Sequence, residues 1–380
     1  MSPDPSPPRR SMVVCSLEPW GEVRRRIQLL VRLLVEDDPA LTVLYVEPPV
    51  DVPRALRHRR FSELRSDRGS DMAGIHVMRP RKWLPRLVGP SVDRSLVGQV
   101  IRAAGRLGLK DPFLWVNDAH YAGLLARTQW PSIYDVTDDW LLASLSPRAR
   151  ARLTADERIL LSDAGAVVVC SPDLAHTRGA TRAVDIIPNA VDVERFRTPT
   201  TRPDDLPPAP VALYVGTLHE DRLDVDLCRQ LAVALPEVQL VLLGPNSLAP
   251  EYSDALGSLA NVHLPGARPY DRIPAYLQHA DVIVIPHKVT PFTESLDPIK
   301  AYECLAAGRI TVATAVAGFR DLGPPVVVAG PETFVAEVRR ALAAPPGATS
   351  VPVDVPTWRD RAGALSAVMD RVLAQSDARP

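Results

Sequence analysis

A short segment near the carboxyl-terminal end combines residue types that can hold an anion. Asp297 is a favourable helix N-cap, Pro298 is a favourable first helical residue, and Gly308 can take the left-handed conformation that ends a helix. Lys300 then lies in the first helical turn, where the helix dipole disfavours a cation by about 0.3 kcal/mol or more. Residues that break a local structural preference in this way are concentrated at functional sites.

A diphosphate bound at this helix N-terminus would explain the lysine. It would accept hydrogen bonds from the N–H groups of the first turn and pair with the charge of Lys300. Glu303 lies one turn further along the same side, where it can accept hydrogen bonds from ribose hydroxyls. The alternative is an exposed Lys300–Glu303 ion pair that contributes little to stability.

Three further positions follow expected strands in this half of the chain: Gly216, Gly244 and the turn Pro286-His287-Lys288. In an open parallel sheet all three face one edge, where ligands bind. Glycine allows close approach of a nucleotide, although a tight turn required by packing alone would also explain both glycines. His287 and Lys288 either contact a phosphate or base, or are solvated.

The first half of the chain offers its own residues at strand ends. Trp20 and Gly21 follow the first expected strand, and His120 follows a later one. We expect Trp20 and Gly21 at the mouth of a cleft, on the acceptor side.

Three carboxylates, Asp135, Asp138 and Asp139, follow another expected strand. Spaced carboxylates can bind a divalent ion. We nevertheless expect no metal, a buried capping or orienting role for Asp135, and an acceptor-side position for Asp135 and Asp138.

The elements that must position these residues follow from alternating short apolar runs and amphipathic stretches, which predict parallel sheets wrapped by helices. The expected strands are 12–16, 42–46, 75–78, 113–116, 132–134, 166–170, 185–187, 212–215, 239–243, 262–264, 282–285, 310–313 and 326–328. The expected helices include 23–34, 92–107, 149–161, 225–235, 273–279, 298–307, 332–342 and 358–373. The polar, basic stretch 54–71 is expected to be a long loop or mobile helix.

A Pro-rich segment, 198–210, is the expected linker. It predicts an N-terminal domain (1–197), a C-terminal domain (198–356) and a final helix (357–380) that packs back on the first domain. A ligand is expected in the cleft between the two similar halves.

In these segments the chain resembles the GT-B glycosyltransferases of the retaining group-1, family 4-like type. The matching stretches occur in the same order: Ile187–Asp192 with Phe196, Tyr214–Leu218, Val241–Pro245, Asp281–Pro286 and Asp297–Gly308. Together they cover most of residues 185–320. The first half matches loosely, at Tyr134–Trp140 and Ser171-Pro172.

The resemblance implies an α/β protein with two Rossmann-like doubly wound domains facing each other across a cleft. It implies that the first domain (1–197) binds the acceptor and the second (198–356) binds the nucleotide sugar. It implies transfer of a sugar, with retention, from a nucleotide-diphosphate sugar to an acceptor hydroxyl or amine. Neither cofactor nor metal is implied, because basic side chains and helix dipoles stabilise the leaving diphosphate. The candidate donor-binding residues are Gly216, Thr217, Arg222, Gly244, His287, Lys288, Pro298, Lys300 and Glu303.

The candidate catalytic residues also rest on the resemblance. His120 resembles a cleft histidine that points at the donor sugar. The family pattern has two glutamates seven residues apart: Glu303 matches the second, while Ser295 occupies the first position with Glu294 beside it. Arg222 is the candidate for a basic residue that holds the diphosphate.

Composition excludes several other classes. The 380 residues carry a net charge of -1, so no global field attracts nucleic acid. The four cysteines are far apart, which indicates buried free thiols in a reducing cytoplasm. The first residues are polar and Pro-rich, unlike a signal peptide, and the expected location is cytoplasmic.

Two arginine clusters stand out, Arg24–Arg26 and Arg54–Arg60. Each is either a solvated face or a contact with an anionic lipid surface or phosphate-bearing acceptor. The acceptor itself is open among a polysaccharide, a lipid-linked sugar and a small natural product. The rival functions are a GT-B-shaped nucleotide-sugar epimerase or phosphorylase, and a non-catalytic nucleotide-sugar-binding partner protein.

Overall fold

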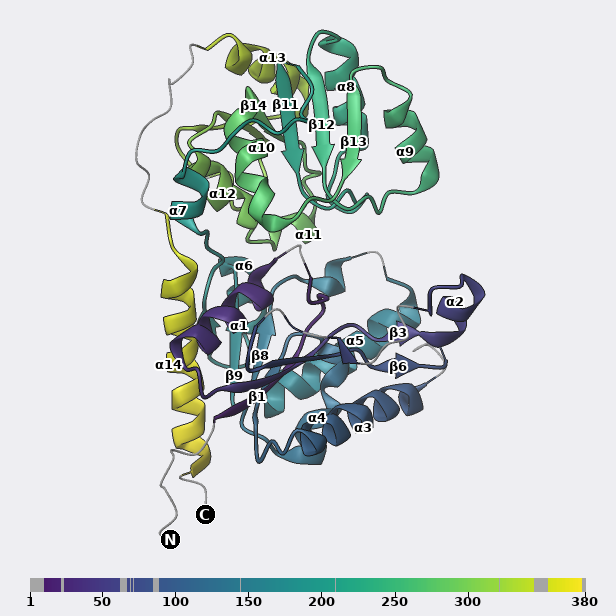
Figure 1. The fold of residues 1–380 in the computed structure, drawn as a ribbon, viewed down its shortest axis with the longest axis vertical. Helices are drawn as coiled ribbons and strands as arrows, with labels where there is room; N and C mark the ends of the chain where they lie inside the picture. Colours follow the sequence, from purple (N-terminus) through teal and green to yellow (C-terminus); the bar gives the residue numbers. More distant parts are fainter. Residues whose placement is uncertain are drawn as a thin grey trace. The chain divides into compact units, whose positions relative to one another are not determined.

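The computed structural model describes residues 10–21, 24–61, 67–68, 70, 72–84, 89–143, 145–208, 210–320, 322–344 and 355–377. The chain forms two compact units (Figure 1). The first comprises residues 1–137, 144–187 and 359–380, and the second comprises residues 138–143 and 188–358.

The first unit is built on an eight-stranded sheet in the order β10-β9-β8-β7-β1-β2-β5-β4, parallel except where β4 meets β5. Its inner strands are buried on both faces, which is why they read as continuous apolar runs. The strands are β1 (Ser11–Cys15), β2 (Thr42–Val46), β4 (Asp67–Arg68), β5 (Ile75–Met78), β7 (Phe113–Val116), β8 (Ser132–Val136), β9 (Ala166–Val169) and β10 (Asp185–Ile186). A separate two-stranded sheet pairs β3 (Val50–Asp51) with β6 (Arg81–Lys82).

Helices cover this sheet. They are α1 (Arg26–Asp37), α2 (Val52–Arg57), α3 (Pro90–Arg106), α4 (Gly123–Thr128), α5 (Pro147–Asp163), α6 (Pro172–Arg178) and α14 (Trp358–Asp377). The last helix, α14, runs beside α1 in Figure 1, and Arg359 pairs with Asp37 at 2.6 Å. A Cβ at Gly165 would meet Val372 of α14 at 2.6 Å, so glycine there admits the helix.

The second unit has a six-stranded, all-parallel sheet in the order β13-β12-β11-β14-β15-β16. The strands are β11 (Val211–Val215), β12 (Gln239–Leu243), β13 (Val262–Gly266), β14 (Val282–Ile285), β15 (Thr311–Thr314) and β16 (Val326–Ala329). The helices are α7 (Val193–Arg197), α8 (Val225–Ala234), α9 (Pro250–Gly257), α10 (Ile273–His279), α11 (Pro291–Glu294), α12 (Ile299–Ala307) and α13 (Pro331–Leu342).

The change of unit lies at 187/188, before the boundary at 197/198 expected from the sequence. The reason is that the Pro-rich segment belongs to the second unit. There Thr200 hydrogen-bonds Gln278 through its N–H at 3.0 Å, and Arg202 donates to the carbonyl of His279 at 3.1 Å. Proline richness therefore marks an irregular segment held against α10, and the chain crosses between units earlier.

The expected elements were found, some with the expected ends, such as β2, β14 and α10, and the others with ends shifted by one to a few residues. The stretch expected as a loop or mobile helix, 54–71, contains most of α2 and the short strand β4, and the rest lies largely outside the described residues. All four cysteines are buried and free, as expected. Burial raises the pKa of Cys304 to about 12, which keeps that thiol protonated.

Candidate functional site

In the second sheet, the direction in which successive strands are added reverses between β11 and β14. From this pair, strand order runs outward through β12 and β13 on one side and through β15 and β16 on the other. The two loops that leave the carboxyl ends of adjacent strands at such a point diverge, and they leave a crevice where ligands bind. The candidate positions Gly216 and His287 follow β11 and β14, so they flank this point.

Backbone hydrogen bonds join the two loops. Lys288 donates its N–H to the carbonyl of Arg222 at 2.7 Å, and its Nζ donates to the carbonyl of Glu220 at 2.8 Å. Arg222, a candidate for holding a diphosphate, is therefore fixed at the same edge as Lys288. Its guanidinium lies 5.5 Å from the ring of Phe292 and 3.3 Å from the carboxylate of Asp138. Asp138, expected on the acceptor side, belongs to the second unit.

The glycines after β11 and β12 pack against each other. Gly244 has a φ of +152°, and a Cβ there would lie 1.9 Å from the carbonyl oxygen of Gly216. A Cβ at Gly216 would lie 2.7 Å from the hydroxyl of Tyr214. Packing alone therefore requires glycine at both positions, which was one of the two explanations left open by the sequence.

His287 is buried, which excludes the solvated alternative for this residue. Its Nε2 is hydrogen-bonded to the hydroxyl of Tyr214 at 3.2 Å. Burial, with a smaller contribution from the charge of Arg222, lowers the pKa of His287 to about 3. The imidazole is therefore neutral at pH 7, and it contacts Tyr214 of the same sheet.

Helix α12 begins one residue later than expected. Its N-cap is Pro298, without a side-chain capping hydrogen bond, so the prediction that Asp297 caps the helix was wrong. The carboxylate of Asp297 instead accepts hydrogen bonds from the N–H of Asn189 and, at 2.8 Å, from the hydroxyl of Tyr302. Gly308 ends the helix with a φ of +64°, as predicted.

Lys300 remains in the first turn of α12, where its Nζ pairs with Oε2 of Glu303. The Lys300 side chain is 26% exposed, whereas that of Glu303 is only 2% exposed. The pair exists, but it is not the exposed pair of the alternative explanation. The ammonium group is the partly exposed member of the pair, where it can pair with an anion.

The residues at the first glutamate position have structural partners. Ser295 is buried, and its hydroxyl donates to the carbonyl of Phe292 at 2.7 Å. Glu294 accepts the N–H of Ala317 at 3.2 Å and pairs with Arg320. Both residues thus stabilise α11 and the loop after β15. Contact of either residue with a sugar stays a prediction.

In the sheet of the first unit, the order of strand addition reverses in the same way between β1 and β7. The N–H groups of Asn117 and Asp118 both donate to the carbonyl of Cys15, at 2.8 and 2.9 Å, which ties the two loops together. His120 stands in this loop, and its Nδ1 donates to the carboxylate of Asp156 at 2.8 Å. Asp156 was not among the predicted residues, because it lies on α5, 36 residues from His120.

Asp135 is completely buried at the end of β8, where it accepts a hydrogen bond from Trp115 at 3.2 Å and pairs with Arg26 at 3.4 Å. This is the orienting role expected for it. Trp20 is also buried: its N–H donates to Glu47 at 2.8 Å, and Gly21 accepts the amide of Gln28 at 2.8 Å.

The two arginine clusters differ in exposure. Arg26 is buried against Asp135, whereas Arg25 pairs with Glu18 at 3.6 Å and its side chain is 40% exposed, so only part of the first cluster faces solvent. Arg54, Arg57, Arg59 and Arg60 are all exposed. Among the described residues, no helix is long and apolar enough to cross a membrane.

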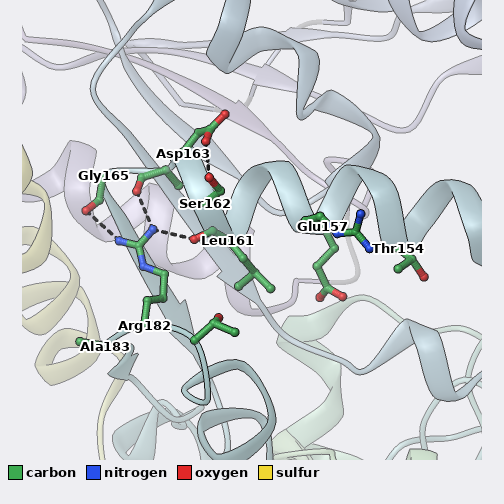
Figure 2. Close-up of a pocket in the computed structure, with 11 residues that line it drawn as sticks. Thr154, Glu157, Leu161, Ser162, Asp163, Gly165, Arg182 and Ala183 are labelled. Carbon is green, nitrogen blue, oxygen red and sulfur yellow. Dashed lines mark hydrogen bonds between the residues drawn. The ribbon is translucent and has the colours of Figure 1, made fainter.

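A cavity of about 840 Å³ lies elsewhere in the first unit, between α5 and the segment before β10 (Figure 2). Arg182 lines it and donates to the carbonyls of Leu161, Ala164 and Gly165 at 2.9, 2.8 and 3.3 Å. The guanidinium thereby caps the end of α5. None of the predicted donor-binding residues lines this cavity.

The chain is similar to known glycosyltransferases in sequence. Residues 209–344 match the family model described as glycosyl transferases group 1. A putative teichuronic acid biosynthesis glycosyltransferase, TuaH of Bacillus subtilis, is 25% identical in an alignment of 232 residues. The alignment covers 56% of this chain. The matched region spans 58% of that relative's length.

Solved structures resemble almost the whole chain. A sucrose-phosphate synthase from Thermosynechococcus elongatus has a TM-score of 0.69 and 18% identity, covering 97% of this chain and 98% of its own. HepE of Anabaena, in complex with UDP and glucose, has a TM-score of 0.62 and 16% identity, covering 98% and 100%. The chain therefore has an α/β fold of the GT-B type, and its residues 209–344 match the group 1 glycosyltransferase family model.

Proposed function

We propose that the protein is a glycosyltransferase that moves a sugar from a nucleotide-diphosphate sugar to an acceptor hydroxyl or amine. The observation that carries the proposal is Lys300 in the first turn of α12, paired with the buried Glu303 inside the group 1 domain. A cation at the positive end of a helix is unfavourable unless an anion joins it.

In this proposal the diphosphate binds Lys300 and the N–H groups at the start of α12, and Arg222 supplies a second positive charge. Glu303 accepts the ribose hydroxyls. The acceptor oxygen or nitrogen forms a bond to the anomeric carbon while the bond from that carbon to the diphosphate breaks. Positive charge beside the leaving group stabilises the transition state.

The first unit is proposed to bind the acceptor, near the loops after β1 and β7. Because Asp156 accepts the Nδ1 proton of His120, the opposite ring nitrogen, Nε2, is left as a hydrogen-bond acceptor. We assign that nitrogen to a hydroxyl of the donor sugar. An Asp156→Asn variant should therefore reduce turnover more than it weakens binding of the nucleotide alone.

Retention at the anomeric carbon and independence from metal rest on the family resemblance and are also proposals. Work at the cytoplasmic side is a further proposal, which rests on composition. HepE is a complex with UDP and glucose, which makes UDP-glucose the first donor to test. GDP- and dTDP-sugars complete the panel.

Calorimetry with the nucleotide-sugar panel, followed by transfer assays on lipid-linked, oligosaccharide and small-molecule acceptors, tests the proposal. We expect micromolar binding of one donor, transfer unaffected by chelators, and an α-linked product from an α-linked donor by NMR. A changed sugar released without acceptor would indicate an epimerase. Donor binding without hydrolysis or transfer would indicate a non-catalytic partner, and absence of any donor binding would refute the proposal.

A further inference from the structure

Large apolar side chains gather on one exposed part of the first unit. Trp83 is 65% exposed, Phe61 is 62% exposed, and Leu84 and Leu56 are 51% and 45% exposed. These four account for a third of the twelve large apolar side chains exposed among the described residues, yet they come from only two short segments. Single exposed apolar residues are ordinary, whereas a group of this size marks an interaction surface.

The structure explains how the two segments meet. β3 pairs with β6 in parallel, with Val50 opposite Arg81 and Asp51 opposite Lys82. Leu56 and Phe61 follow β3 on and after α2, while Trp83 and Leu84 directly follow β6. Figure 1 shows α2, β3 and β6 together at one side of the first unit.

This element is held on the first unit by α3 and by a small apolar cluster, while its large apolar side chains are exposed. Gln99 of α3 holds Arg81 through two hydrogen bonds of 2.9 Å each, one to its N–H and one to its carbonyl. Val50, Val52 and Ala55 form a small buried cluster beneath α2. The cluster does not include the exposed apolar residues Leu56, Phe61, Trp83 and Leu84. Packing in the core of the first unit therefore does not explain why these four positions are apolar.

The same surface is strongly basic. Its cations are Arg54, Arg57, Arg59, Arg60, Arg81 and Lys82, and the segments 50–61 and 81–84 contain a single acidic residue, Asp51. Asp51 lies 3.6 Å from Lys82 and caps the start of α2. Arg54, Arg57 and Arg59 are exposed, and they concentrate positive charge on a chain whose net charge is only -1.

One arginine occupies a backbone position that favours glycine. Arg59 has a φ of +55°, and it ends α2 in a Schellman turn: its N–H donates to Leu56 at 3.1 Å, and the N–H of Arg60 donates to Ala55 at 2.8 Å. A residue other than glycine is strained in this conformation. The turn therefore keeps an arginine at a cost to stability, which fits a role for its side chain at the surface.

We propose that this basic-aromatic surface, formed by α2, β6 and residues 58–61 and 83–84, docks on an anionic lipid bilayer. Arginines attract acidic headgroups, and Trp, Phe and Leu gain free energy when they enter the interface between headgroups and acyl chains. A soluble polyanion would use the arginines but leave Trp83 and Phe61 in water. The inference does not depend on the glycosyl transfer proposed above, because each readout is binding.

Vesicle co-sedimentation of the full chain tests the proposal. We expect binding to vesicles of phosphatidylcholine with 30% phosphatidylglycerol, chosen as roughly the anionic content of a bacterial membrane surface. Binding should be weak on phosphatidylcholine alone and should fall with added salt. Arg57→Gln and Arg59→Gln should each reduce partitioning roughly fivefold. The matched control, Arg229→Gln on the exposed face of α8, should have no effect.

Two variants separate docking from folding. Arg59→Gly should raise thermal stability, because it relieves the strained turn, and yet weaken vesicle binding. Trp83→Phe should still bind, but should lose the quenching of tryptophan fluorescence by brominated lipid that the wild type shows. The proposal is wrong if binding is independent of anionic lipid, if quenching persists in Trp83→Phe, or if polyphosphate binds equally well and Trp83→Ala changes nothing.

Discussion

Lys300 and Glu303 form an ion pair in which the anion, not the cation, is the buried partner. Glu303 extends from α12 into the protein, whereas Lys300 remains partly in water at the first turn. A ligand that approaches this helix therefore meets the ammonium group first. In the proposed site the ammonium group pairs with the diphosphate and the carboxylate accepts the ribose hydroxyls, so replacing either residue tests both stability and donor binding.

Replacing Lys300 with Ala should lower both stability and donor affinity while leaving the fold intact. The buried carboxylate of Glu303 loses its cation, and we expect the free energy of unfolding in urea to fall by about 1–2 kcal/mol. Calorimetry should show donor affinity at least about tenfold weaker, or about 1.4 kcal/mol. Glu303→Ala should weaken donor binding similarly.

The exposed i,i+3 pair of α13, Glu337 and Arg340, is the matched control. Arg340→Ala should cost less than about 0.5 kcal/mol and leave donor affinity unchanged. Unchanged affinity in both Lys300→Ala and Glu303→Ala would overturn the site assignment.

Gly244→Ala should strongly destabilise the second unit. The added Cβ would lie 1.9 Å from the carbonyl oxygen of Gly216, at a φ of +152° that other residues rarely adopt. We expect a loss of about 3 kcal/mol or more in chemical unfolding. Gly257→Ala, where nothing lies within 4 Å of the added Cβ, should change stability by less than about 1 kcal/mol. Equal effects of the two changes would contradict the close approach of the two loops.

Stability should fall in mild acid because of His287. Its pKa is about 3 in the folded protein and near 6.5 when unfolded, so the unfolded chain binds one more proton between these values. Stability from this group is present above pH 6.5 and lost as the pH falls towards 3. We expect a loss of about 2 kcal/mol between pH 7 and pH 5.

Urea unfolding at both pH values measures this loss. In His287→Asn the pH-dependent difference should shrink by the same amount, whereas His76→Gln, at an exposed position of β5, should keep it. A wild-type slope retained in His287→Asn would show that another group is responsible.

Asp135→Asn should test the buried ion pair of the first unit. Removing the charge leaves Arg26 buried without its carboxylate, which typically costs about 3–5 kcal/mol. The exposed pair Asp226–Arg229 on α8 provides the comparison, since Arg229→Ala should cost less than about 0.5 kcal/mol. Thermal unfolding gives both values. A small effect at Asp135 would mean that Arg26 readily finds water or another partner.

Local sequence determined the elements and part of the site. Buried parallel strands are continuous apolar runs, so β9 and β14 were recognisable without knowledge of their neighbours. Gly308 ends α12 as predicted because its left-handed conformation is a property of one residue. Lys300 and Glu303 were found together because they are one helical turn apart.

Only the tertiary structure decided the states of side chains whose partners are distant in sequence. Asp297 was expected to cap α12, but it bonds Asn189, 108 residues away. His287 is neutral because the sheet and Tyr214 exclude water from it. Arg26 is buried while Trp83 is exposed, the reverse of what residue type alone suggests. The physical reason is that propensity acts along the chain, whereas desolvation depends on which surfaces the whole fold brings together.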